Sequence, residues 1–143
     1  MANMNGAIAG SICFFVRAFE GGGAQRDAIL LANGIAAAGR AASIVTLHDA
    51  GPLRVLVDPR VPVVDLGRGG KLRMALALPR LRAFMAASGP EVFVASEAGG
   101  NALATLAAGL LGRRRPKLVL REVASPLQAK ANDPYLQNRI GYR

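Results

Sequence analysis

The chain has 143 residues, which is enough for one domain and too few for two of ordinary size. Apolar residues make up 52% and aromatic residues 5%, which favours helices packed on a sheet over an aromatic platform for single-stranded nucleic acid. The net charge of +9 favours an anionic partner, although the arginine-rich composition also fits a GC-rich genome. The single cysteine, Cys13, excludes a disulfide framework or a cysteine metal site within the chain.

Short apolar runs recur along the chain, and each is apolar on both sides of an extended backbone. This pattern predicts strands that are buried on both faces of a parallel sheet. The predicted strands are Ala7–Val16, Ala42–Leu47, Val61–Leu66, Glu91–Ala95 and Lys117–Arg121.

Apolar residues repeat at helical spacing in three of the intervals between these strands. The apolar stripes of the predicted helices run over Ala28–Ala38, Met74–Met85 and Leu103–Leu110, and a glycine follows the first and third where a C-terminal cap belongs. We expect Pro79 to start or kink the second helix. The alternation predicts one α/β domain over residues 1–143, a Rossmann-like three-layer sandwich with a mainly parallel sheet.

One connection and the tail depart from this alternation. The segment between the second and third strands contains Pro and Gly but no helical pattern, so we expect a loop with a short extra strand at Leu53–Val57. Near the end of the sequence, Asp133 and Pro134 are typical of a helix start.

Three glycines, Gly21–Gly23, stand between the first strand and the first helix. In a parallel sheet such a turn lies at the carboxyl edge of the strands, where ligands bind. Free N–H groups at a helix start favour an anion, and glycine lets the backbone approach it closely. The dinucleotide fingerprint fails because Arg26 occupies its third glycine position, and the phosphate-loop pattern is absent. A glycine-rich turn without a ligand is the alternative.

The stretch "GGGAQRDAILLANGIAAAGRAASIVTL" resembles the start of the retaining, two-domain glycosyltransferases of family 4, also called glycosyl transferases group 1. Members begin with a strand, a GG turn, a small residue, Glu or Gln, and then Arg, a pattern matched here from Gly22 to Arg26. The later stretches "VPVVDLG", "LPRLRAFMAASGPEVFVASEAGGNALATLAA" and "PKLVLRE" resemble the family's N-terminal domain in order and spacing. The resemblance therefore covers nearly the whole chain.

The resemblance implies the N-terminal half of a GT-B fold, in which two Rossmann-like domains face each other across a cleft. It implies a hexosyltransferase that moves a sugar from a nucleotide-diphosphate donor to a hydroxyl of a glycan or lipid-linked acceptor. The donor would bind mainly in a C-terminal domain that this sequence lacks, so the chain alone should be inactive. Gly22 and Gly23 inherit the family's approach to the donor's diphosphate or sugar. Gln25 and Arg26 match the motif, but first-turn solvation and helix packing explain them equally well.

Ser96 and Glu97 follow the predicted fourth strand at the same edge of the sheet. Both could hydrogen-bond acceptor hydroxyls, and the glycines at 99 and 100 could admit a sugar ring. The alternative is that Ser96 caps the next helix.

Arg121 and Glu122 follow the fifth strand and match a family stretch that often continues with a histidine pointing into the cleft. Val123 and Ala124 occupy those places here, so no catalytic residue is assigned. We expect Arg121 and Glu122 to contact the acceptor, with an Arg–Glu ion pair as the alternative.

His48, the only histidine, follows the second strand beside Asp49. Because no other ligands cluster nearby, we expect a loop histidine and no metal site, and no cofactor besides the nucleotide-sugar substrate. Asp49 could instead read a ribose in a dinucleotide fold. A free-standing nucleotide-binding domain is therefore one alternative function, and a non-enzymatic basic binding module is another.

Two groups of basic residues stand out. Arg113–Lys117 is expected to form a solvated loop at the amino edge of the sheet, and without aromatic interleaving we do not expect nucleic acid as a partner. The second group consists of Arg68, Lys71, Arg73, Arg80 and Arg82. It contains no acidic residue, and it favours peripheral contact with an anionic membrane. No targeting segment or membrane span stands out, so the expected location is the cytoplasm, including the inner face of the membrane.

Overall fold

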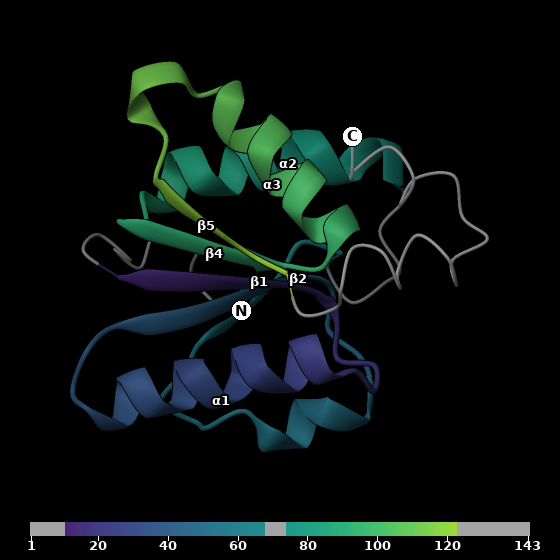
Figure 1. Cartoon of the computed structure of the whole chain (residues 1–143), viewed down its shortest axis with the longest axis vertical. Coiled ribbons are helices and arrows are strands. Elements are labelled where there is room, and N and C mark those ends of the chain that lie inside the picture. Colours follow the sequence, from purple (N-terminus) through teal and green to yellow (C-terminus); the bar gives the residue numbers. More distant parts are fainter. Residues whose placement is uncertain (1–10, 68–73, 123–143) are drawn as a thin grey trace.

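The computed structural model describes residues 11–67 and 74–122. Within them, five parallel strands form one sheet in the order β3-β2-β1-β4-β5 (Figure 1). The strands are β1 (Ile12–Ala18), β2 (Ala42–His48), β3 (Val63–Asp65), β4 (Val92–Ser96) and β5 (Lys117–Arg121). The helices are α1 (Gly23–Ala37), α2 (Met74–Ser88) and α3 (Ala98–Gly109), with short 3-10 helices η1 (Pro52–Leu56) and η2 (Gly112–Arg114). The prediction of a Rossmann-like three-layer α/β fold is confirmed.

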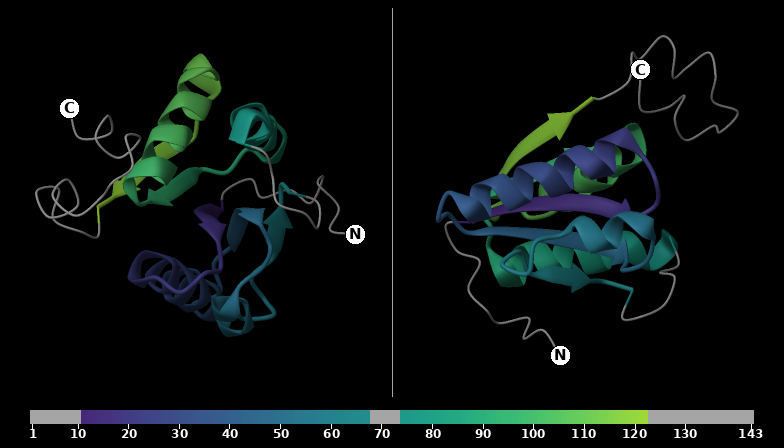
Figure 2. Two further views of the ribbon diagram at one scale, coloured as in Figure 1. Left: turned by 90° about the vertical axis from the view of Figure 1, so that its right-hand side faces the viewer. Right: turned by 90° about the horizontal axis from the view of Figure 1, so that it is seen from below.

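The sheet separates two apolar layers. Helix α1 covers one face, and helices α2 and α3 cover the other (Figures 1 and 2). Side chains alternate along β1, so Phe14 packs on the α1 side with Ile29, whereas Phe15 packs on the other side with Phe93 and Leu81. Both faces of the central strands are therefore buried, as the continuous apolar runs predict.

The predicted elements match the observed ones except in a few places. Strand β1 is described from Ile12 onward, because residues 7–10 of its predicted range lie outside the described residues. Strand β3 is shorter than predicted, although backbone bonds from Ile44 to the Pro62 carbonyl and from Leu66 to the Thr46 carbonyl continue the pairing at both ends. The predicted tail helix at Asp133 and Pro134 also lies outside the described residues.

The extra strand predicted at Leu53–Val57 is wrong, because this segment forms the 3-10 helix η1. Gly51, with φ +129°, turns the chain there, and its Cα lies against the backbone of Phe19 and the nitrogen of Glu20. Pro52 then opens the short helix, and the Leu53 N–H donates to the Phe19 carbonyl over 3.0 Å. This hydrogen bond joins the segment to the turn after β1, and the N–H groups of Arg54 and Val57 bond within the segment and its own turn, not to a neighbouring strand.

The proposal that Pro79 starts the second helix is also wrong. Helix α2 begins at Met74 and runs through Pro79 to Ser88. Proline cannot donate a helical hydrogen bond, but this residue is exposed, and the helix is held by core residues on its inner face. Those residues are Ala77, Leu81, Phe84 and Met85.

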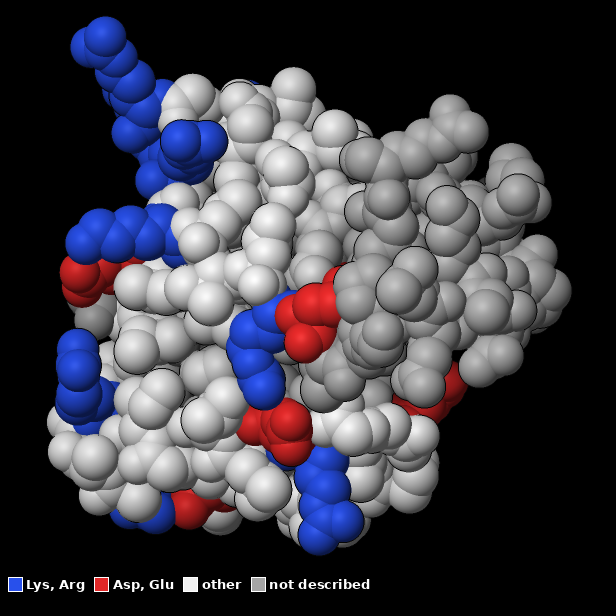
Figure 3. All heavy atoms as spheres, in the orientation of Figure 1, with Lys and Arg blue, Asp and Glu red and all other residues white. Residues whose placement is uncertain are grey.

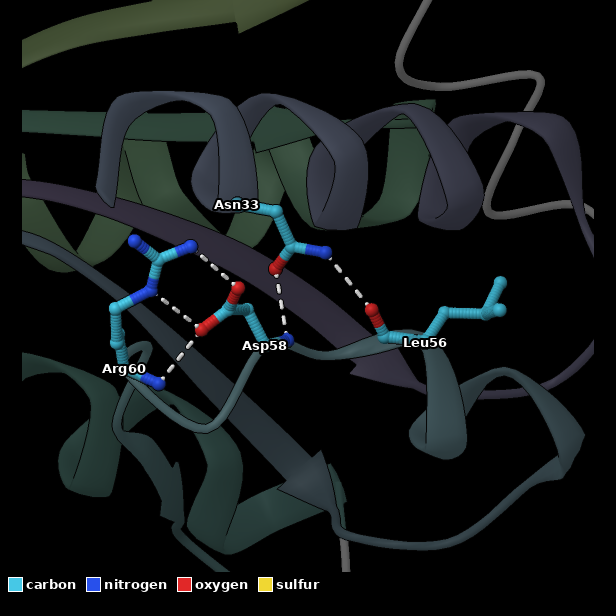
Figure 4. A network of polar contacts seen from close by, with 4 residues as sticks. All are labelled: Asn33, Leu56, Asp58 and Arg60. Atoms are coloured by element: carbon cyan, nitrogen blue, oxygen red, sulfur yellow. Dashed lines mark hydrogen bonds and ion pairs between the residues drawn. The ribbon is translucent and has the colours of Figure 1, made fainter. Parts of the chain in front are cut away.

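The long connection between β2 and β3 is fastened to α1 by polar contacts (Figure 4). The amide of Asn33 donates to the Leu56 carbonyl over 2.8 Å and accepts from the Asp58 N–H over 2.9 Å. Arg60 closes the network by donating to both carboxylate oxygens of Asp58. One helix side chain therefore satisfies backbone groups at two points of a segment that has no sheet to bond to.

Candidate functional site

The candidate site lies at the carboxyl edge of the sheet, between β1 and β4. These neighbouring strands lead into helices on opposite faces, since β1 continues into α1 and β4 into α3 (Figure 1). In open parallel sheets this reversal of direction is the topological switch point, where ligands bind. The left view of Figure 2 looks onto the carboxyl edge and shows α1 and α3 on either side of the sheet.

Gly22 occupies the cap position of α1 with an ordinary extended backbone, at φ −151° and ψ 151°. No side chain caps the amides of the first helical turn, and no acidic residue stands in that turn. A Cβ atom at Gly22 would meet the side-chain amide of Gln25, which folds back over it. A side chain at position 22 would therefore displace the Gln25 amide from its present place.

The flanking glycines differ from Gly22. Ideal Cβ atoms at Gly21 and Gly23 would meet no atom within 4 Å, and both residues are exposed. No packing demand within the described residues explains a glycine at either position. At Gly23, the first residue of the uncapped helix, this open space is what an approaching anion needs.

Glu97 links the two turns of the switch point. Its carboxylate accepts from Arg17 of β1 over 2.9 Å and from the side-chain amide of Gln25 of α1. Within residues 11–67 and 74–122, Glu97 is the one non-glycine residue with a positive φ, at +73°. Such a backbone costs about 1–3 kcal/mol and persists only where the surroundings impose it. The glutamate thus holds the glycine turn against the end of β4 in a strained conformation.

Arg121 forms a second link across the same edge. Its guanidinium lies 3.4 Å from the Asp27 carboxylate of α1, and its carbonyl accepts from Asn101 of α3 over 3.1 Å. Within residues 11–67 and 74–122, two buried side-chain atoms of this group, Nη1 of Arg121 and Oδ1 of Asn101, have no hydrogen-bond partner. Buried polar atoms without partners are uncommon in folded proteins, so this pair marks a place where the described residues leave polar groups unsatisfied.

The structure brings most of the predicted site residues to one edge. Gly22 and Glu97 are joined through Gln25, and Ser96 stands opposite Arg121 in the pairing of β4 with β5. Ser96 is buried and is not the cap of α3, because Glu97 holds that position without a capping hydrogen bond. Glu122 is exposed and follows Arg121 at the same edge, and Arg121 pairs with Asp27.

Two expectations about neighbouring residues are corrected. Gly100 cannot admit a sugar ring, because it is buried and a Cβ atom there would lie 3.7 Å from the Phe15 ring. His48 is the last residue of β2 and not part of a loop. Asp49 follows it at the carboxyl edge and accepts a hydrogen bond from Arg54 over 2.6 Å, and the Arg54 guanidinium lies 5.5 Å from the centre of the Phe19 ring.

Three members of this site were not predicted from the sequence: Arg17, Asp27 and Asn101. Arg17 carries the one signal that could have been used, since a charged residue near the end of an otherwise apolar strand stands at the ligand-binding edge. Asp27 and Asn101 follow the starts of α1 and α3 by about one turn. Nothing in their sequence context distinguishes them from solvated helix residues.

Comparison of the sequence with models of known protein families gives no match, and comparison with curated proteins gives none either. Within the described residues, none of the helices combines the length and the apolar character that crossing a bilayer requires. In the same residues, His, Cys, Asp and Glu form no group of three or more that could hold a metal ion. Membership of the family 4 glycosyltransferases, which the motifs resemble, therefore remains a proposal.

Proposed function

We propose that this chain is the N-terminal, acceptor-side half of a retaining GT-B glycosyltransferase. The reaction would transfer a sugar from a nucleotide-diphosphate donor to a hydroxyl of a glycan or lipid-linked acceptor. The observation that carries the proposal is the position of Gly22 and Gly23, which open an uncapped helix at the switch point of the sheet. The motifs resemble those of family 4 in the same order, and we therefore assign contact with the donor to this glycine turn.

The geometry suits the stabilisation of a leaving diphosphate. Backbone N–H groups at the start of α1 and the helix dipole favour negative charge, and the open space at Gly23 lets phosphate oxygens approach. Arg17 adds a half-exposed guanidinium beside the same turn. Positioning and electrostatic stabilisation of this kind account for much of the catalysis of group transfer. A second domain would supply the opposite wall and most of the donor contacts.

Polar side chains at this edge suit an acceptor. A sugar hydroxyl both donates and accepts, so it fits an edge that carries the partly exposed Arg121 guanidinium and the partly exposed Glu97 carboxylate. Ser96, Glu97 and Glu122 stand at the same edge and remain candidate acceptor contacts. We place such an enzyme in the cytoplasm, or at the inner face of the membrane when the acceptor is lipid-linked.

A second candidate function is a free-standing Rossmann-like nucleotide-binding domain. The strand order and the acidic Asp49 directly after β2 favour it, because an acid at that place reads a ribose in dinucleotide folds. Asp49 is engaged by Arg54, however, and the glycine fingerprint is broken at Arg26. A non-enzymatic basic binding module is the third candidate, favoured by the charge alone.

The test is an assay of the complete product of the gene against a panel of nucleotide-sugars with hydroxyl acceptors. The proposal predicts release of a nucleoside diphosphate that requires both a donor and an acceptor. Release without any acceptor dependence, or no release with any donor, would contradict it. Tight binding of NAD or NADP by the 143-residue chain would favour the second candidate instead.

A further inference from the structure

The outward face of α3 carries no charge. The whole helix lacks charged side chains, and the sequence has no acidic residue between Glu97 and Glu122. Its inward face packs small residues on the core, whereas Leu106 and Leu110, one turn apart, are each 58% exposed. A surface helix normally turns polar and charged residues to the solvent. Within the described residues, this apolar face has nothing packed on it.

Arginines follow directly at the C-terminal end of this helix. Arg113, Arg114 and Arg115 lie on and after η2, and all three are exposed. None of the ion pairs among the described residues involves them, and the nearby Lys117 already faces Glu91. Figure 3 shows basic side chains at the upper left, beyond the end of α3, next to an uncharged surface over α2 and α3.

We propose that Leu106, Leu110 and the three arginines form one docking surface, the α3 surface, for a membrane that contains anionic lipids. The leucines would enter the boundary between headgroups and acyl chains, and the arginines would pair with lipid phosphates. Apolar side chains beside unpaired cations are the combination that such an interface requires. This inference does not depend on the proposed function.

Other partners fit the α3 surface less well. Nucleic acid would pair with the arginines but would leave both leucines in water, and the sequence from Glu97 to Glu122 contains no aromatic residue that could stack on a base. A second copy of the chain, joined through the same surface, would offer the arginines no carboxylate, because the sequence has no acidic residue between Glu97 and Glu122. Arg80, from the basic group expected to contact a membrane, instead donates to the Leu66 carbonyl over 2.7 Å. Of the same group, Arg68, Lys71 and Arg73 lie outside the described residues, so the α3 surface is defined by other residues than the predicted ones.

The experiment is sedimentation of the 143-residue chain with vesicles of phosphatidylcholine, and with vesicles that also contain phosphatidylglycerol. One variant, Leu106→Gln with Leu110→Gln, removes the apolar contact. A second, Arg113→Gln with Arg114→Gln, removes charge. The matched controls lie on or after α1, across the sheet: Leu30→Gln with Leu31→Gln changes two exposed leucines, and Arg26→Gln with Arg40→Gln changes two exposed arginines.

We expect binding to the anionic vesicles and not to phosphatidylcholine alone. Each arginine near an anionic surface is worth about fivefold in partition coefficient, so the double arginine variant should bind about 25-fold more weakly. The double leucine variant should lose at least about tenfold, because two apolar side chains no longer enter the interface. Both controls should stay within about threefold of the unchanged chain, since their sites would face away from the bilayer.

Several results would overturn the proposal. The first is no binding to anionic vesicles, and the second is an equal loss in the controls, which would mean that the net charge of +9 acts diffusely. The third is tighter binding to duplex or single-stranded nucleic acid than to anionic vesicles at the same salt concentration. Circular dichroism of each variant separates loss of binding from loss of fold.

Discussion

The carboxylate of Glu97 accepts a hydrogen bond from the side-chain amide of Gln25, which lies 72 residues earlier in the sequence. The same glutamine folds over Gly22, so one side chain connects the glycine turn of α1 to the turn that opens α3. This contact makes the two turns of the switch point a single unit.

Gly22→Ala should break the contact between Gln25 and Glu97, because the new methyl group occupies the space of the glutamine amide. We expect a loss of about 1 kcal/mol in the free energy of unfolding, from one hydrogen bond to a charged acceptor that is partly exposed. Urea denaturation measures this loss, and NMR of the Gln25 side-chain amide reports the contact directly. Gly21→Ala is the control and should change neither, because its Cβ atom meets nothing within 4 Å. If the chemical shift of the Gln25 side-chain amide is unchanged in Gly22→Ala, the contact is absent in solution.

Glu97→Ala and Glu97→Gly should differ in stability, although both remove the same side-chain contacts. Alanine would keep the strain of φ +73°, whereas glycine adopts this backbone freely. We expect the glycine variant to be the more stable of the two by about 1–2 kcal/mol in urea denaturation. Equal stability, or a more stable alanine variant, would mean that position 97 is not strained.

Gly51→Ala should destabilise the fold by at least about 2 kcal/mol. A Cβ atom at this position would overlap the carbonyl group of Phe19 and lie 2.7 Å from the nitrogen of Glu20, and φ of +129° is strained for any other residue. Gly34→Ala is the matched control in the middle of α1, where a Cβ atom meets nothing and alanine favours the helix. Thermal unfolding should show a lower Tm for Gly51→Ala and a slightly higher one for Gly34→Ala, because alanine in the helix adds about 0.5–1 kcal/mol to the free energy of unfolding. A Tm for Gly51→Ala equal to that of the unchanged chain would contradict the close approach of the two loops.

Asp58 should titrate at an unusually low pH. The hydrogen bonds from the Arg60 guanidinium and backbone, together with its charge, lower the pKa of Asp58 from 3.8 to about 2. Because the folded pKa is the lower one, its contribution to stability is present above pH 3.8 and is lost as the pH falls toward 2. In Arg60→Ala, NMR titration of the carboxyl carbon should show the pKa of Asp58 returning toward 3.8. An unchanged pKa in that variant would assign the shift to another cause.

The periodicity of apolar residues was enough to predict the sheet and its three helices, because buried parallel strands and amphipathic helices leave different patterns. It failed at η1, where a partly buried Leu53 and Val57 flank exposed residues much as in a strand. The backbone of Gly51 decides that segment, through contacts with a turn far away in the sequence.

The candidate site was predicted in part for a similar reason. Ser96 and Arg121 end parallel strands and Glu97 follows one, so chain order alone places them at one edge. The partners of these residues could not be found this way. Arg17 and Glu97 are 80 residues apart and Asp27 and Arg121 are 94 apart, and no local pattern encodes such pairings.

The most direct test of the proposed function compares Gly23→Ala with Gly21→Ala in the complete gene product. Both positions have open space for a methyl group, so neither change should harm the fold. If the turn approaches a donor diphosphate, Gly23→Ala should lower acceptor-dependent release of nucleoside diphosphate at least about tenfold, because one stabilising backbone contact is displaced. Gly21→Ala should retain most of the activity, since Gly21 stands outside the matched motif. Equal activity of Gly23→Ala and the unchanged protein, or no transfer from any nucleotide-sugar, would contradict the account.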